Sequence, residues 1–379
     1  MARAKAAKKN PKVAPKKTSG DPVVEQIVTS ARDMRGRIVA GRKPSMKFPL
    51  RSLSNVRYNA RKGHFEMLGK QKERTLTVST VKSFAQTLRM IELSKQLIET
   101  GDRATKRDAY YQTKNWDEAR CDDQVESDTL MDDIEALFGV NKEKLHFTPD
   151  EHGGLVAGEL VVIDREMGTG APIEIDCTKF GSGSYGIPIE VEGLGFRTKA
   201  KFILAIETGG IFDRLNRHRF WEKSDCILVS MAGVPTRSVR RFIRRLADEK
   251  KIPVYVFVDC DPYGIGNIYR TLKAGSGNNA HLNEFFCVPQ ARFLGVSPQD
   301  IVDYDLPTHP LKDVDIKRAK DALKNDPFFQ HHGEWKKSLT QLLKLGKRAE
   351  QQAFAKFHLN FVMDTYLPDK LKRPEKFLP

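Results

Sequence analysis

Hydrophobic residues recur at helical spacing in two stretches near the start of the chain. Residues 79–100 carry one apolar face, and Gly101 provides a natural end for a helix. Residues 122–140 carry a second apolar face, with an aspartate at the start that can cap it. The short segment between them, 104–116, is also helical in character. The pattern therefore predicts three consecutive helices.

Two short runs of β character follow these helices. They span 144–148 and 155–164 and flank a turn-like sequence at 150–154. Three helices followed by a hairpin are typical of a winged-helix domain, a helix-turn-helix variant that places a helix against DNA. We therefore expect a small α+β domain in this part of the chain.

Strands and helices alternate from about residue 200 onward. Continuous apolar runs at 202–206, 226–230 and 253–258 are typical of strands buried on both faces, and the basic segment 236–249 is expected to be a helix. Strands joined by helical connections predict a parallel sheet. Residues 335–367 have the pattern of one or two amphipathic helices. The predicted fold class is α/β plus α+β.

The charge balance of the chain indicates a class of binding partner. The 379 residues include 64 Lys and Arg against 49 Asp and Glu, giving a formal net charge of +15. That balance favours a polyanion such as nucleic acid as the partner. Residues 1–20 hold seven of the basic residues and no acidic one, and we expect them to form a disordered basic tail.

Nothing in the sequence indicates a membrane or secreted protein. No apolar stretch approaches the roughly eighteen residues that a membrane span needs, and no apolar segment follows the basic N-terminus. The five cysteines include no Cys-x-x-Cys pair, which fits a reducing cytoplasm. The adjacent His331 and His332 point apart in regular structure, which argues against a zinc site.

Three acidic residues fall at the ends of predicted strands. Glu207 follows the strand at 202–206, and Asp259 and Asp261 follow the strand at 253–258. The carboxyl ends of parallel strands share one sheet edge, where carboxylates suit a hard cation such as Mg²⁺. Helix capping would explain an isolated Asp-x-Asp equally well, but Glu207 and the glycines at 264 and 266 favour a metal site. This set resembles the Toprim (topoisomerase–primase) signature, which leaves primase, nuclease and topoisomerase open.

A candidate nucleophile lies in the second predicted helix. Arg107 and Tyr111 stand one helical turn apart and share a face. A tyrosine hydroxyl becomes a useful nucleophile when a nearby cation or base favours the phenolate. A phosphotyrosyl ester also conserves the energy of the broken DNA bond. Paired tyrosines such as Tyr110 and Tyr111 are otherwise usually packing residues.

Taken together, these motifs resemble one family. A Lys-Arg-Asp-x-Tyr-Tyr run in a winged-helix domain, followed by a Toprim Glu and Asp-x-Asp-Pro-Tyr-Gly, is similar to the A subunit of topoisomerase VI. This type IIB family also contains the meiotic double-strand-break transesterase. The resemblance runs over most of residues 75–371, with further similar stretches at 153–160, 259–276, 291–301 and 361–371.

The resemblance implies a role for each candidate residue. Tyr111 would attack a phosphodiester of double-stranded DNA, and Arg107 would assist it. Glu207, Asp259 and Asp261 would hold Mg²⁺. The tyrosine of one A subunit would act over the metal site of the other, so the active unit would be a homodimer that leaves each 5′ end covalently bound. Tyr110 would then pack or line the DNA.

The resemblance also implies a partner subunit. The chain has no Gly-x-x-x-x-Gly-Lys-Ser/Thr loop, so ATP would bind a GHKL-type B subunit in an A2B2 heterotetramer. The expected domains are the tail 1–20, a segment 21–73 for docking the B subunit, a winged-helix domain 74–165, and a Toprim domain 166–379 with C-terminal helices. We expect a cytoplasmic, nucleoid-associated enzyme with no membrane contact.

Departures from the family pattern leave some local contacts in doubt. Thr208 follows the first acid where a lysine is common, and Thr236 and Val239 replace an Asp and a Thr. Arg240 and Arg241, on the basic helix, are candidate DNA contacts, although a solvated face is the ordinary interpretation of such a run.

Three alternatives remain open. The chain could be a meiotic-type transesterase, a catalytically silent DNA-binding homologue, or a metal-dependent Toprim nuclease. The complete set of Tyr111 and three acids argues against a silent homologue, and a nuclease would not explain Tyr111.

Overall fold

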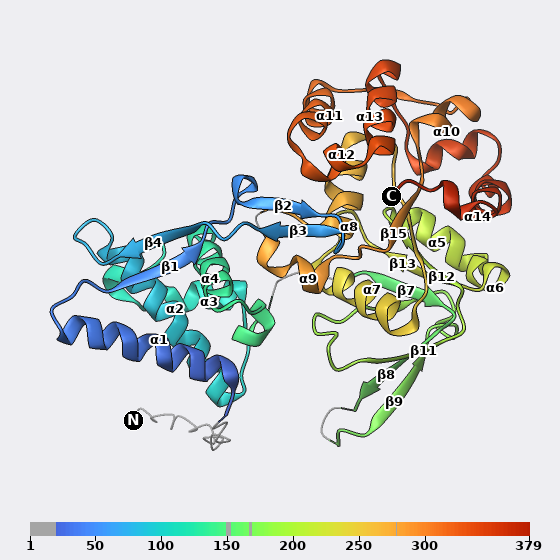
Figure 1. Ribbon diagram of the computed structural model, residues 1–379. Helices are drawn as coiled ribbons and strands as arrows, with labels where there is room; N and C mark the ends of the chain where they lie inside the picture. The colour runs from blue at the N-terminus through green and yellow to red at the C-terminus, as the bar shows by residue number, and fades with distance from the viewer. Residues whose placement is uncertain (1–19, 149–152, 167–168, 278) are drawn as a thin grey trace, which may run out of the picture. The chain divides into compact units, whose positions relative to one another are not determined.

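The computed structural model describes residues 20–148, 153–166, 169–277 and 279–379. The chain forms two compact units (Figure 1). The N-terminal unit consists of Met1–Pro49 and Gln71–Asp150, and the C-terminal unit of Leu50–Lys70 and Glu151–Pro379. The expected basic tail lies, apart from Gly20, outside the described residues. Within the described part of the chain, no helix combines the length and the apolar character needed to cross a membrane.

The three helices predicted for the N-terminal unit are confirmed. Gly101 ends the first of them in the left-handed conformation, with φ of 70°. Asp123 caps the third by accepting a hydrogen bond from the backbone N–H of Glu126. A further helix and an antiparallel strand pair precede them in sequence. These elements are α1 (Pro22–Val39), β1 (Ser45–Pro49), β4 (Gln71–Thr75), α2 (Val81–Thr100), α3 (Lys106–Thr113) and α4 (Gln124–Phe138).

The predicted hairpin after these helices is wrong. The strand β6 (Phe147–Thr148) pairs in parallel with β5 (Ala104–Thr105), inside the N-terminal unit. The strand β7 (Leu155–Gly158) instead pairs with β13 (Cys226–Ser230) in the C-terminal unit. Three of the four β7 residues are buried there, so the apolar character that suggested a wing reflects burial in another sheet. Part of the expected turn, residues 150–152, lies outside the described residues.

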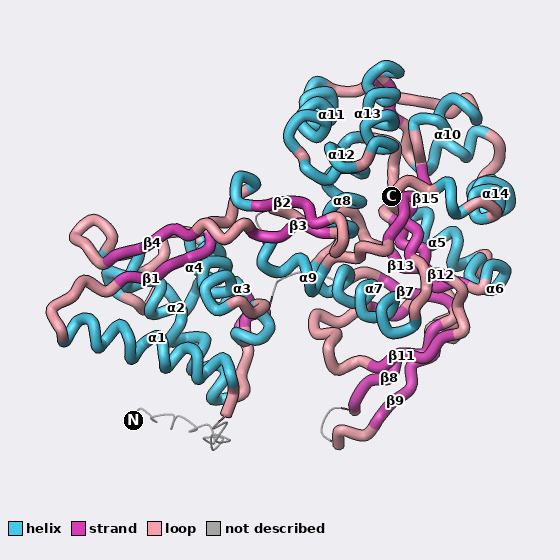
Figure 2. Tube along the Cα trace, in the orientation of Figure 1, coloured by secondary structure: helices cyan, strands magenta, loops and turns pink. Residues whose placement is uncertain are grey.

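A six-stranded mixed sheet forms the centre of the C-terminal unit. Its order is β10-β7-β13-β12-β14-β15, and the last four strands are parallel. The three predicted strands are confirmed, and every residue of β12 and β13 is buried. Figure 2 shows α5 and α6 beside β13. The newly introduced strands are β10 (Tyr185–Gly186), β12 (Phe202–Ile206), β14 (Val254–Phe257) and β15 (Ala291–Gly295).

Helices and a smaller sheet complete this unit. The predicted basic helix is α7 (Arg237–Lys250). The predicted C-terminal helices are confirmed only as far as α13 (Gly333–Leu345), because short helical turns follow it. A three-stranded antiparallel sheet has the order β11-β8-β9. The remaining bounds are α5 (Gly209–Arg217), α6 (Phe220–Ser224), α8 (Arg270–Ala274), α9 (Asn283–Phe286), α10 (Pro298–Asp303), α11 (Asp313–Asn325), α12 (Pro327–His331), α14 (Leu367–Leu371), β8 (Leu160–Arg165), β9 (Pro172–Asp176), β11 (Gly195–Thr198), β16 (His309–Pro310) and β17 (Lys347–Arg348).

A hairpin from early in the sequence belongs to the C-terminal unit. It consists of β2 (Val56–Asn59) and β3 (His64–Met67), drawn in blue beside the orange helices α8 and α9 in Figure 1. The ring of Tyr58 on this hairpin packs edge-on against Phe328, with centroids 5.6 Å apart. The expected docking segment 21–73 is therefore divided between the two units.

One buried side chain closes the base of this hairpin. Asn55 is fully buried, and its Nδ2 donates to the carbonyls of Leu50 (2.8 Å) and Lys70 (3.0 Å). Its Oδ1 accepts from the N–H of Lys70 at 2.9 Å. Asn55 thus links the two residues at which the chain enters and leaves the hairpin segment.

Candidate active site

Three carboxylates lie at the carboxyl edge of the parallel strands, as predicted. β12 and β14 are neighbours in register, which brings Glu207 beside Asp259. The backbone N–H of Asp259 donates to Glu207 Oε2 at 2.8 Å. Asp261 follows two residues later, and its Oδ1 accepts from the N–H of Gly264 at 2.6 Å. We call these three residues the acidic edge.

Gly264 packs closely against the residues of the acidic edge. A Cβ at this position would lie 2.8 Å from the carbonyl oxygen of Asp259, 3.3 Å from Glu207 Oε2 and 3.4 Å from Asp261 Oδ1. One backbone carbonyl oxygen and two carboxylate oxygens of the acidic edge therefore pack so closely against Gly264 that they leave no room for a side chain. The φ angle of Gly264 is not in the left-handed region, so this glycine is required for space rather than for backbone freedom.

The acidic edge is electrostatically unfavourable without a cation. Burial, reinforced by the charges of Asp259 and Asp261, raises the pKa of Glu207 to about 7. Burial, reinforced by Asp261 and by the nearby Glu350, raises the pKa of Asp259 to about 6. Burial and like charges both penalise ionised carboxylates, and a bound cation would relieve the second penalty.

The residues present fit a magnesium ion by their chemistry. All of the donors are carboxylate oxygens, which Mg²⁺ prefers, and Mg²⁺ often binds through one or two carboxylates while keeping several waters. Among the described residues, no group of three or more His, Cys, Asp or Glu side chains is placed so that it could already hold a metal ion. The acidic edge therefore has the donor chemistry of a magnesium site, but its side chains do not converge as a formed metal centre.

A segment distant in sequence supports the acidic edge, and no sequence pattern indicated it. Cys260 and Ala349 form a backbone bridge with hydrogen bonds of 2.8 and 3.2 Å. The N–H of Gln351 donates to Asp259 Oδ1 at 2.9 Å, across 92 residues of sequence. Arg348 lies with Nη1 3.7 Å from Asp261 Oδ2. Only the folded structure brings these residues together.

The helix α3 presents Arg107 and Tyr111 on its exposed face, in the N-terminal unit. Thr105 begins the helix with a capping box shared with Asp108. Ala109 lies on the buried face, whereas the Tyr111 side chain is 57% exposed. Arg107 is also exposed. Among the described residues, no hydrogen bond engages the Tyr111 hydroxyl, so this hydroxyl is available for chemistry.

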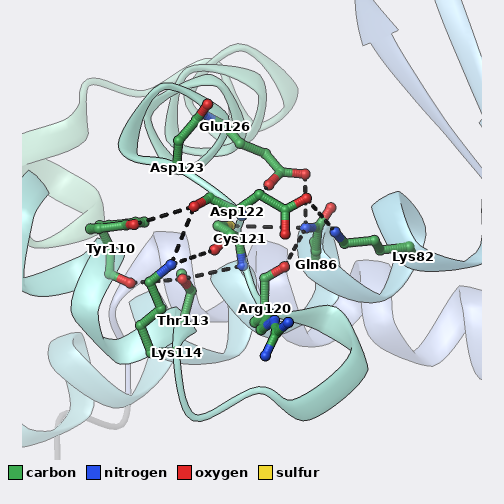
Figure 3. A network of polar contacts seen from close by, with 10 residues as sticks. All are labelled: Lys82, Gln86, Tyr110, Thr113, Lys114, Arg120, Cys121, Asp122, Asp123 and Glu126. Atoms are coloured by element: carbon green, nitrogen blue, oxygen red, sulfur yellow. Dashed lines mark hydrogen bonds and ion pairs between the residues drawn. The ribbon is translucent and has the colours of Figure 1, made fainter.

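Tyr110 differs sharply from its neighbour. Its hydroxyl donates to the carbonyl of Asp122 at 3.4 Å. The Nζ of Lys114 lies 4.4 Å from the centre of the Tyr110 ring and donates to the carbonyl of Cys121 at 2.8 Å. Figure 3 shows these contacts converging on the loop before α4. Tyr110 is therefore a packing residue, one of the two roles that the sequence left open for it.

The same network ties three helices together. Gln86 on α2 donates to the carboxylate of Glu126 on α4 at 2.9 Å, and to the carbonyl of Arg120 at 3.1 Å. Lys82 pairs with the carboxylate of Asp122 at 2.9 Å. Figure 3 shows this set around the loop that follows α3. The network holds the helix that carries Tyr111 against its two neighbours.

The arginines of α7 are engaged within the C-terminal unit. Arg241 pairs with Glu192 and donates to the carbonyl of Phe285. Arg240 is only 8% exposed and lies 5.7 Å from the centre of the Phe286 ring. The basic face of α7 thus contacts α9 and the loop that contains Glu192 rather than solvent alone, and a role of Arg240 and Arg241 in DNA binding stays a prediction.

The departures from the family pattern have a local explanation at α7. Thr236 caps this helix by accepting a hydrogen bond from the N–H of Val239 at 3.3 Å. Threonine therefore keeps the capping role that an aspartate at this position would have. Thr208 precedes α5 without a side-chain capping bond.

Comparison with known families covers most of the chain from residue 82 to residue 371. Residues 82–147 match the family described as "Type IIB DNA topoisomerase". Residues 150–200 match "All-beta domain in DNA topoisomerase VI alpha subunit", and residues 202–371 match the Toprim domain of the topoisomerase 6 A subunit and Spo11. The predicted fold class, an N-terminal domain followed by a Toprim domain with a largely parallel sheet, is confirmed.

Individual proteins are similar over nearly their whole length. A protein of Methanocaldococcus jannaschii, named as the A subunit of type 2 DNA topoisomerase 6, is 52% identical over 355 residues, covering 94% of this chain and 96% of the relative. A protein of the same name from Halobacterium salinarum is 38% identical, covering 92% and 95%. One from Methanothermobacter thermautotrophicus is 37% identical, covering 89% and 94%.

Proposed function

Because this chain belongs to the family of topoisomerase VI A subunits, which are type IIB DNA topoisomerases, we propose that it is the DNA-cleaving subunit, with Tyr111 as its nucleophile. The observation that carries this assignment is the contrast within the tyrosine pair. Tyr110 is held by a hydrogen bond and by Lys114, whereas the exposed Tyr111 keeps a hydroxyl with no hydrogen-bond partner in the described chain.

The proposed step is a transesterification. The Tyr111 oxygen forms a bond to the phosphorus of a DNA phosphodiester while the bond from phosphorus to the 3′ oxygen breaks. The tyrosine loses its proton, the 3′ end leaves as a hydroxyl, and the 5′ end remains bound as a phosphotyrosyl ester. The reverse step reseals the strand without an outside energy source. Arg107, exposed on the same face of α3, would favour the phenolate and the developing negative charge.

The acidic edge would supply the second part of the site. Glu207, Asp259 and Asp261 would hold Mg²⁺ through their free carboxylate oxygens. When bound, the ion would stabilise charge on the phosphodiester oxygens. The chain itself contributes the fixed positions of the acids, through hydrogen bonds from backbone N–H groups, and the space left by Gly264.

The full reaction would require further subunits. Two copies of this chain would supply the two tyrosines of a double-strand break, and a GHKL-type B subunit would bind ATP and drive strand passage in an A2B2 assembly. Residues 21–73, divided between the two units, remain the candidate docking segment for that partner. The expected place of action is the cytoplasm, on the DNA of the nucleoid.

Substitution of the two tyrosines tests this proposal directly. Tyr111→Phe should abolish covalent protein–DNA adducts, because it removes the attacking oxygen, while Tyr110→Phe should leave adduct formation in place. Adducts are measured by denaturing electrophoresis of end-labelled duplex DNA after incubation with the chain, Mg²⁺, ATP and the B subunit. Adducts that persist in Tyr111→Phe would show that the nucleophile is a different residue.

A further inference from the structure

We propose that Arg348 binds a DNA phosphate at the acidic edge, which adds a positively charged residue to the proposed active site. This inference rests on the proposed function, because it places DNA at Glu207, Asp259 and Asp261. The Arg348 guanidinium lies beside these acids and yet makes no hydrogen bond within the described part of the chain.

The backbone fixes the position of Arg348. β17, which carries it, pairs with β16 through His309. The next residue, Ala349, bridges Cys260 in the middle of the acidic edge. Arg348 therefore stands beside Asp261, just as Gln351 stands beside Asp259 on the same segment.

The donors of Arg348 are uncommitted. Its Nη1 lies 3.7 Å from Asp261 Oδ2, a distance that allows an ion pair but exceeds a hydrogen bond. Its Nε is buried and has no acceptor among the described residues. Since Nε is buried while the side chain is 24% exposed, a phosphodiester would be bound by the terminal Nη groups, whose forked N–H donors match the oxygens of a phosphate.

Two other arginines of this unit have donors that are already engaged. Arg241 pairs with Glu192 and donates to a backbone carbonyl. Arg197 makes two hydrogen bonds to Glu174. Their donors are already used, whereas the Arg348 side chain is 24% exposed and within reach of a ligand at the acidic edge.

The charge balance gives a reason for such a residue. Three carboxylates lie at the acidic edge, and Glu350 lies on the adjoining segment, between Ala349, which bridges Cys260, and Gln351, which donates to Asp259. A DNA phosphate approaching them is repelled unless positive charge lies nearby. A bound cation would supply part of that charge, and Arg348 supplies a part that stays in place without the metal. The competing explanation is that Arg348 only balances the charge of Asp261.

Salt dependence of DNA binding separates these two explanations. Binding of duplex DNA to the full chain is measured by fluorescence anisotropy over a range of KCl concentrations, in the Tyr111→Phe background so that no cleavage occurs. Loss of one phosphate contact should reduce the slope of log affinity against log salt by about 0.9. We expect this reduction in Arg348→Met, with affinity lower by roughly tenfold. Arg197→Met, which removes an equal charge from an arginine already paired, is the matched control and should keep the original slope.

Arg348→Lys adds a second test, independent of the folding of the Met variant. A lysine keeps the charge but not the fork, so the slope should be preserved while affinity falls. Wild-type slope and affinity in Arg348→Met, with an unchanged melting temperature, would overturn the proposal and leave Arg348 as a partner of Asp261 alone. Failure of the function itself would show up separately, as an absence of Tyr111-dependent adducts in the wild-type protein.

Discussion

Replacement of Gly264 by alanine should damage the acidic edge more than any other change of a single methyl group. The added Cβ would lie 2.8 Å from the carbonyl oxygen of Asp259, closer than real Cβ atoms come to backbone atoms, and 3.3 and 3.4 Å from Glu207 Oε2 and Asp261 Oδ1. The backbone oxygen cannot rotate away as a flexible side chain could. Either the helical turn after Asp261 moves or the carboxylates do.

The magnitude follows from the cost of overpacking a buried site. Such insertions cost about 1–3 kcal/mol, and each kcal/mol lowers the melting temperature of a domain of 150–250 residues by about 2–4 °C. We therefore expect Gly264→Ala to remain folded with a modest loss of stability. Its Mg²⁺-dependent adduct formation should fall far more steeply, because displacement of the Glu207 and Asp261 side chains would move the carboxylates that are expected to hold the ion.

Gly266 provides the matched control in the same helical turn. A Cβ at Gly266 would meet no atom within 4 Å. Gly266→Ala should be neutral or slightly stabilising, since alanine favours helical backbone by up to about 1 kcal/mol over glycine. Melting curves with and without Mg²⁺, together with the adduct assay, measure both effects. Normal cleavage by Gly264→Ala, or equal damage from Gly266→Ala, would refute the proposal that the carboxylates packed against Gly264 hold the metal ion.

Three further outcomes follow from the structure. The pKa values of Glu207 and Asp259 are raised to about 7 and 6, so protonation of these acids stabilises the metal-free protein fully below about pH 4, and this stability is lost as the pH rises through 6 to 7. Thermal melts should show that loss. Mg²⁺ should reverse it at about pH 8, where the acids are ionised, but not at about pH 5. Asn55→Ala removes one of the donors to each of the carbonyls of Leu50 and Lys70, and the acceptor of the Lys70 N–H. It should lower the free energy of unfolding by about 1–3 kcal/mol in urea titrations; an unchanged value would mean that water replaces the amide. Thr236→Ala should cost about 1 kcal/mol by the same measurement, as loss of a helix cap does, whereas Thr236→Asp should cost nothing.

Local patterns of apolar residues predicted most of the helices and strands, and burial explains which of them could be predicted. β12 and β13 are buried along their whole length, so their sequences are continuously apolar. The helix α2 is amphipathic and ends at a glycine with positive φ. The pairing of the strands was predicted wrongly. β7 has the composition of a strand, but nothing in its sequence indicates that it pairs with β13, about 70 residues further along.

Some residues of the candidate site could also be predicted from the sequence, whereas others could not. The acids could be predicted because they directly follow strands whose ends must meet at one edge. Arg348 and Gln351 could not, because they reach that edge through a backbone bridge between Cys260 and Ala349. The different states of Tyr110 and Tyr111 also required the structure, since only the fold shows which hydroxyl faces a carbonyl.

The early hairpin has a consequence for the order in which the chain is made. β2 and β3 leave the ribosome long before the residues on which they pack, because Tyr58 contacts His332 across 274 residues of sequence and Phe65 meets Asn283 across 218. At about 5–20 residues per second, translation of that interval takes on the order of 15–55 seconds. The hairpin must wait through this time with Phe65, fully buried in the finished protein, exposed to other nascent chains. Synthesis of this protein thus creates a long window in which chaperone binding to residues 50–70 would protect the yield of folded enzyme.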